Sequence, residues 1–167
     1  MPRTGSCICR YGSESQCARK AIRLNRRLFS NLESLSTVTL SIAVLTTSLL
    51  FGGMTLYSFG FAGFLFTALP ADVAGTTLRR AFPLFYLFVI ATAAVASALV
   101  WSHDALSGAL LAAIAITTVP SRQLLMPAIN AATDNGLRTR FKWLHALSVV
   151  ITLAHIIAAA YVLLRLV

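Results

Sequence analysis

Charged residues are scarce in this chain, and acidic residues are the scarcest. Asp, Glu, Lys and Arg make up 11% of the 167 residues, only five are acidic, and 57% of the chain is hydrophobic. A soluble core of this length could not bury so much apolar surface, so the composition predicts that lipid is the solvent. Beyond the N-terminal segment the acids, Asp72, Asp104 and Asp134, lie between apolar runs. This distribution argues against a proton-driven pump, whose relays usually need carboxylates or histidines within the spans.

Cysteine is absent from the apolar body. Cys7, Cys9 and Cys17 all lie near the N-terminus, so disulfides cannot hold the predicted fold together. The three thiols could bind a soft metal, but a fourth ligand and a nearby histidine are missing, which favours unpaired thiols. The sequence also has no Gly-rich phosphate loop, no Ser-His-Asp arrangement and no zinc-type spacing. A non-enzymatic protein is therefore favoured.

Long hydrophobic runs are what the sequence has in place of charge. No charged residue occurs between Ser36 and Ala71, although about 20 apolar residues suffice to cross a bilayer as a helix. The predicted fold class is all-α, a polytopic membrane protein with a four-transmembrane-helix bundle at 36–167 after a basic extension at 1–35. The predicted spans are about 38–64, 82–100, 106–125 and 143–164, with a loop at 71–78, a polar connection at 130–140, and a kink near Pro120.

Basic residues cluster at the N-terminus, where half of the fourteen Lys and Arg precede residue 28. Segment 1–35 is predicted to be disordered or an interfacial amphipathic helix, because its arginines and apolar residues fall on different helical faces. A mitochondrial-type presequence or an over-extended start are the alternatives. Anionic lipid explains the net charge of +9, and no nucleic-acid partner is expected, since no soluble domain remains to present a basic face. The expected location is the bacterial inner membrane, with a mitochondrial membrane as the alternative.

Two histidines at membrane depth are candidate site residues. His145 and His155 are ten residues apart on one predicted helix, or about 15 Å along its axis, so they cannot bind the same ion. Each could be a ligand, paired with a methionine or a backbone group rather than with a second histidine. Each could instead be a hydrogen-bonded neutral imidazole. The expected polar neighbours are Ser148 for His145, and Thr46 or Thr47 for His155.

Arg122 and four glycines complete the candidates. Arg122, near the end of the third span, either anchors the helix at the interface or forms a cationic pocket for an anion with Arg138, Arg140 and His145. The glycines of the first span are expected to let helices approach closely rather than to line a substrate path. They are Gly52, Gly53, Gly60 and Gly63.

Several short motifs resemble those of a known family. They are Gly52-Gly53-Met54, Phe64 to Leu69, Ala74-Gly75, Phe82-Pro83 with Tyr86, and the Phe-x-x-Leu-His-x-x-Ser element from Phe141 to Ser148. Together they resemble the transmembrane protein 205-like family of unknown function, in its bacterial form, because Met126 stands where eukaryotic members have an acid. The family is distantly similar to copper-resistance protein D-like membrane proteins and to haem-dependent protoporphyrinogen oxidases. The resemblance implies a four-helix membrane bundle and carries no catalytic residue.

The expected function is a non-enzymatic structural or small-solute-handling role in the membrane, with no cofactor. One alternative is a redox protein that binds haem or copper through His145 or His155. The other is a transporter that works as a homo-oligomer, because four helices offer little room for a water-filled path within one subunit. The lipid bilayer is the expected partner in each case.

Overall fold

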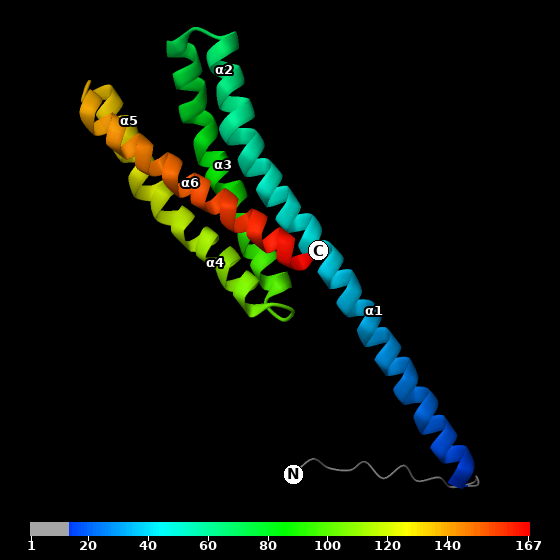
Figure 1. The fold of residues 1–167 in the computed structure, drawn as a ribbon. Helices are drawn as coiled ribbons and strands as arrows, with labels where there is room; N and C mark the ends of the chain where they lie inside the picture. Colours follow the sequence, from blue (N-terminus) through cyan, green and yellow to red (C-terminus); the bar gives the residue numbers. More distant parts are fainter. Residues whose placement is uncertain (1–13) are drawn as a thin grey trace. The chain divides into compact units, whose positions relative to one another are not determined.

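In the computed structural model of the chain, residues 14–167 are described, with side chains from residue 22 onward except that of Leu24. Every regular element in this part of the chain is helical. The elements are α1 Glu14–Thr55, η1 Leu56–Phe61, α2 Ala62–Ala68, α3 Ala71–Val100, α4 Ala105–Pro120, η2 Ser121–Leu125, α5 Met126–Asp134 and α6 Arg138–Leu166, where η marks π-helical turns (Figure 1). The all-α prediction is confirmed.

The chain divides into two compact units, Met1–Thr39 and Leu40–Val167. In the first unit, the described residues belong to α1, and the described side chains from Ile22 to Val38 are exposed. Cys7 and Cys9 lie outside the described residues, as does the side chain of Cys17. The interfacial position expected for the N-terminal segment stays a prediction.

Four helical segments of the described chain are long and apolar enough to cross a membrane. They are Asn25–Ala68, Ala71–Val100, Ala105–Asp134 and Arg138–Leu166. The protein is thus an integral membrane protein with four such helices, as composition and hydrophobic runs predicted. Which membrane holds it stays a prediction.

The helices extend beyond the apolar runs. Helix α3 begins at Ala71, directly after Pro70, with Asp72 in its first turn, so the predicted loop at 71–78 is wrong. Proline cannot continue a preceding helix but suits a helix start, and a carboxylate there interacts favourably with the helix dipole. The polar connection predicted at 130–140 shrinks to residues 135–137, since α5 ends at Asp134 and α6 begins at Arg138.

A kink was predicted near Pro120, and the structure has a change from α-helix to π-helix there. Helix α4 ends at Pro120, the π-helical η2 follows, and α5 continues in the same apolar segment. Proline has no N–H to donate to the preceding turn, and a π-helical turn is one way to absorb the missing hydrogen bond. The third span therefore stays helical to Asp134.

Helices α3 and α4 form an antiparallel hairpin joined at residues 101–104 (Figure 1). Small residues bring the two helices together. The Ser97 hydroxyl donates to the Gly108 carbonyl at 2.9 Å, and a Cβ at Gly108 would lie 3.0 Å from the Trp101 Cα. Larger side chains would separate the helices here, so close packing replaces the hydrophobic drive that lipid does not supply.

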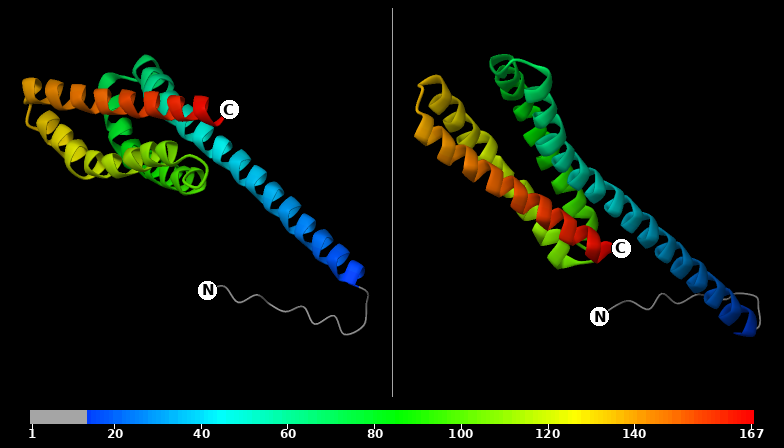
Figure 2. Two further views of the ribbon diagram at one scale, coloured as in Figure 1. Left: turned by 60° about the horizontal axis from the view of Figure 1, so that its bottom comes forward. Right: turned by 45° about the horizontal axis from the view of Figure 1, so that its top comes forward.

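The core of the second unit lies between these helices and the flanking parts of α1 and α6. Its fully buried side chains include Leu50, Met54, Val100, Leu111, Ile114 and Val162. At one end of the unit, Arg165 of α6 donates to Asp104, in the turn between α3 and α4, at 2.8 Å. At the other end the α2–α3 and α5–α6 turns lie apart in each view (Figure 2).

Candidate functional site

A groove lies between η1, α2 and α3 on one side and α5 and α6 on the other. We call it the lateral groove; its volume is about 460 Å³. Apolar side chains form most of its wall, among them Phe59, Phe66, Leu78, Phe82, Ile129 and Leu153. Because Phe59 and Phe66 are themselves exposed, the groove opens on the apolar outer surface of the helices. Its size and its apolar wall are typical of small-molecule sites.

Aromatic packing fixes one wall of the groove. Tyr57 stacks on Phe85 with ring centroids 4.2 Å apart and meets the edge of Phe82 at 5.6 Å. This packing leaves the Tyr57 hydroxyl buried without a hydrogen-bond partner in the described part of the chain. Buried polar groups are usually paired, so this unpaired hydroxyl is an exception, and it lies in a side chain that lines the groove.

An ion pair bridges the two sides of the groove near the helix turns. Arg79 of α3 lines the groove, and its Nη1 lies 2.6 Å from Asp134 Oδ1 at the end of α5. The side chains are 37% and 62% exposed. Such an exposed pair contributes little to stability because water and salt screen it. Arg79 was not among the site residues predicted from the sequence, because an arginine that ends an apolar run has no signal of its own for a groove.

His145 and Ser148 both line the lateral groove, together with Asn130 and Thr133. The His145 ring lies parallel to Phe141, one turn earlier on α6, with ring centroids 5.5 Å apart. Ser148 was expected to form a hydrogen bond with His145. It lies instead beside the Tyr86 hydroxyl of α3. The partner of the Ser148 hydroxyl thus comes from a facing helix and not from the residue three positions earlier on its own helix.

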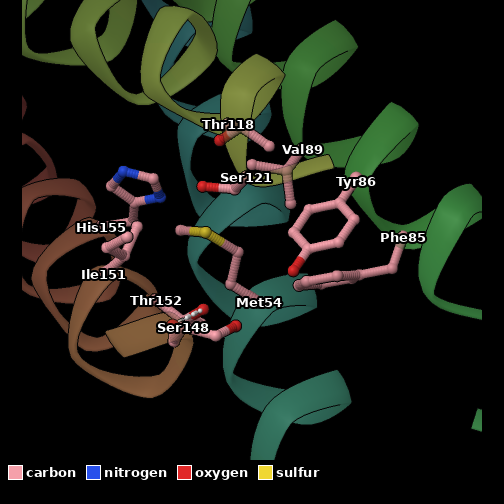
Figure 3. A pocket seen from close by; sticks show the side chains of 10 residues that line it. All are labelled: Met54, Phe85, Tyr86, Val89, Thr118, Ser121, Ser148, Ile151, Thr152 and His155. Atoms are coloured by element: carbon pink, nitrogen blue, oxygen red, sulfur yellow. Dashed lines mark hydrogen bonds between the residues drawn. The ribbon is translucent and has the colours of Figure 1, made fainter. Parts of the chain in front are cut away.

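A second, much smaller cavity lies deeper between the helices, with a volume of about 10 Å³. Met54, Ser121 and His155 point into it from α1, η2 and α6 (Figure 3). This space is about that of one water molecule or ion. Thr118, Ser148, Thr152 and Tyr86 also line it, so it is rich in hydroxyl groups for a membrane core.

His155 has a threonine partner, but on a different helix from the one expected. Its Nε2 lies 2.8 Å from Thr117 Oγ1 of α4, whereas Thr46 and Thr47 both donate to carbonyls of their own helix. The prediction of Thr46 or Thr47 as the partner of His155 is wrong, because the ring nitrogen is bonded to Thr117 instead. Thr117 Oγ1 also lies 2.6 Å from the Ala113 carbonyl, which can only accept.

The proton positions at His155 follow from this geometry. When the single Thr117 hydroxyl proton goes to the carbonyl of Ala113, Nε2 carries the proton that it shares with Thr117. Nδ1 of a neutral His155 then has a free lone pair. In Figure 3 the ring edge on the cavity side faces Met54 and Ser121.

Other predicted site residues are dispersed. Arg122 lies in η2, lines neither cavity, and has a buried Nε without a hydrogen-bond partner in the described chain. Among the four glycines, Gly53 is approached by another helix: a Cβ there would lie 2.6 Å from the Phe88 ring. A Cβ at Gly52 or Gly63 would have no such neighbour within 4 Å. Gly108 was not among the predicted glycines, but a Cβ there would meet backbone, with the Trp101 Cα at 3.0 Å.

The geometry defines a class of protein: an integral membrane helix bundle with a lateral groove and a small polar cavity. The chain belongs to a family described as a domain of unknown function (DUF4149), whose model matches residues 45–138. No curated protein and no solved structure matches the chain. The matched residues include Tyr57 and Arg79 but end where α6 begins, so His145 and His155 lie beyond them.

Proposed function

We propose that the protein binds a hydrophobic or amphiphilic small molecule of the bilayer in the lateral groove, as a non-enzymatic, solute-handling protein. The observation that carries the proposal is a groove of about 460 Å³ whose apolar wall includes a few polar groups. Among the described residues, no group of three or more His, Cys, Asp or Glu could hold a metal ion. The apolar wall with a few polar groups is what supports binding of a small molecule in the groove.

Filling the groove tests this proposal. Gly75 lines the groove, and a Cβ there would have open space around it. Gly75→Leu should therefore fold while taking up groove volume, and should weaken binding of a fluorescent amphiphile to protein in nanodiscs by about tenfold, or about 1.4 kcal/mol.

Gly63→Leu is the matched control. It adds the same side chain where a Cβ also meets open space, but Gly63 does not line the groove. Binding should stay at the wild-type level in this variant. Equal binding by wild type and Gly75→Leu would refute the groove as the site.

A second candidate function is binding of a monovalent copper ion in the small cavity. Its support is that Met54 and the His155 ring line the same cavity of about 10 Å³, with the Nδ1 lone pair free. Thioether and imidazole ligands without a carboxylate suit Cu(I) better than harder divalent ions. The cavity has no room for haem, which would have to lie in the lateral groove, where His145 and Met126 line the wall.

Copper titration with matched methionine variants tests this candidate. Met54→Leu and His155→Gln should each weaken Cu(I) binding by more than about tenfold. Met126→Leu changes a methionine of the lateral groove and should leave copper binding unchanged. An absorption spectrum of the same samples tests haem: a Soret band lost in His145→Ala would move haem binding to first place.

A further inference from the structure

Resting on the proposed function, we infer that the occupant of the lateral groove is an anionic phospholipid of the surrounding bilayer. Its acyl chain lies along the apolar wall, and its phosphate replaces Asp134 as the partner of Arg79. Three features of the groove carry this inference: its length, the position of its polar groups, and the charge at one end.

The length of the groove suits one acyl chain. Along α6 its wall runs from Phe141 to Ile156, which is about 22 Å at 1.5 Å per residue. A single leaflet contributes about half of the ~30 Å hydrocarbon thickness. A chain that enters from the leaflet can thus lie within the groove with its headgroup near the α2–α3 and α5–α6 turns.

The polar groups of the groove are graded along this length. Thr133 lies at the end of α5, and Arg79 reaches the same end through its ion pair with Asp134. Asn130 lies one helical turn further in, and His145 lies one turn beyond Phe141. The buried Tyr57 hydroxyl has no partner in the described chain. A phospholipid carries ester oxygens between its phosphate and its chains, so these groups have acceptors to bind. A free fatty acid offers only its terminal carboxylate.

Charge selects an anionic headgroup. The parts of α3, α5 and α6 next to these turns carry five cations, Arg79, Arg80, Arg138, Arg140 and Lys142, but only two acids, Asp72 and Asp134. Arginine binds phosphate through two parallel hydrogen bonds. Because Arg79 and Asp134 are both partly exposed, their ion pair is weak enough for a phosphate to displace the carboxylate.

Two variants of the ion pair separate its structural role from a binding role. Arg79→Gln and Asp134→Asn both break the pair, so a purely structural contact would give them the same effect. If Arg79 binds phosphate and Asp134 competes with it, the effects have opposite signs. Arg79→Gln should lower binding of phosphatidylglycerol by about tenfold, and Asp134→Asn should raise it a few-fold.

The experiment is native mass spectrometry of the full chain, delipidated in detergent and titrated with phosphatidylglycerol or phosphatidylcholine of the same acyl chains. Wild type should prefer phosphatidylglycerol by about tenfold, because the quaternary ammonium of phosphatidylcholine is repelled by the surrounding cations. Arg79→Gln should weaken binding of phosphatidylglycerol more than binding of phosphatidylcholine and so reduce this preference. Arg80→Gln, which removes an equal charge outside the groove wall, is the control and should lose much less of this preference than Arg79→Gln.

The outcomes distinguish the inference from the proposed function. If Gly75→Leu removes both lipids but wild type shows no preference, the groove binds amphiphiles and the anionic inference is wrong. If oleate binds through Arg79 and phosphatidylglycerol does not, the occupant is a fatty acid and the inference is also wrong. If Gly75→Leu changes no lipid binding, the proposed function itself fails.

Discussion

Threonine hydroxyls show how single residues behave in these helices. Thr46, Thr47, Thr92 and Thr118 each donate to a carbonyl of their own helix three or four residues earlier. This bond satisfies the hydroxyl without another helix, as expected where water is absent. Thr117 does the same, and its oxygen also lies within hydrogen-bond distance of His155 Nε2, at 2.8 Å. A hydroxyl already bonded to its own helix can therefore still pair a histidine of a facing one.

Two adjacent glycines give a prediction at the residue scale. A Cβ at Gly53 would lie 2.6 Å from the Phe88 ring, whereas one at Gly52 meets open space. Gly53→Ala should lower the free energy of unfolding by about 1 to 3 kcal/mol through overpacking. Gly52→Ala should leave it unchanged or raise it by up to about 1 kcal/mol through helix propensity.

The measurement is thermal unfolding of both variants in the same detergent, with circular dichroism as the signal. If the two substitutions shift the melting temperature equally, Phe88 moves aside freely and the contact does not constrain α1 against α3. The two positions differ in nothing that sequence spacing could reveal, since they are neighbours in one apolar run.

At the scale of elements, the turn between α3 and α4 is held by one carboxylate. Asp104 accepts from the Leu106 N–H at 3.1 Å, from the Ser107 hydroxyl at 2.6 Å and from Arg165 at 2.8 Å. These bonds, that of Ser107 foremost and then that of Arg165, hold the pKa of Asp104 below its ordinary value of 3.8. One side chain thus caps α4 and ties the end of α6 to the hairpin.

The lowered pKa predicts how this contact depends on pH. A carboxyl whose pKa is lower in the folded state stabilises the fold above its unfolded pKa, about 3.9, and loses that contribution as the pH falls through the folded value. Asp104→Asn should lower the melting temperature at pH 7. The gap to wild type should close as the pH falls below about 4.

Melting curves of wild type and Asp104→Asn between pH 7 and pH 3 check this, with Asp72→Asn as a control. Asp72 lies in the first turn of α3 at the other end of the second unit. A gap between wild type and Asp104→Asn that stays constant with pH would show that geometry, not charge, holds the turn.

The predicted ends of the helices differ most from the structure. The predicted membrane spans ended where polar residues begin. In the structure, α3 starts at Ala71 and α5 continues to Asp134. Apolar runs report which residues avoid water, whereas hydrogen bonding along the backbone continues past the apolar part. The π-helical turns η1 and η2 are set by local hydrogen-bond shifts, of which Pro120 was the only signal recognised.

At the scale of the whole molecule, the lateral groove is a product of how the helices diverge. The lateral groove exists because the α2–α3 and α5–α6 turns lie apart, while α3 and α4 pack closely near Gly108 (Figures 1 and 2). Residues far apart in sequence, such as Tyr57, Arg79 and His145, then line one surface. A groove of this kind needs no oligomer to form its wall, and the homo-oligomeric state stays a prediction.

The sequence by itself determined the class of this protein. Hydrophobic runs of sufficient length, with charge confined to their edges, leave only helices as a way to satisfy backbone hydrogen bonds in lipid. It also marked His145 and His155 as unusual, because ionisable groups at membrane depth need a partner. The class follows from composition and the unusual histidines follow from their position along one helix. Neither conclusion requires knowing which helices are in contact.

Only the tertiary structure decided which residues meet. His155 pairs with Thr117 rather than Thr46 or Thr47 because α6 lies against α4 at that depth. Arg79 lines the groove, whereas Arg122 lies outside it. Helix rotation and crossing are set by side-chain packing summed over many contacts, so a single sequence pattern does not contain them.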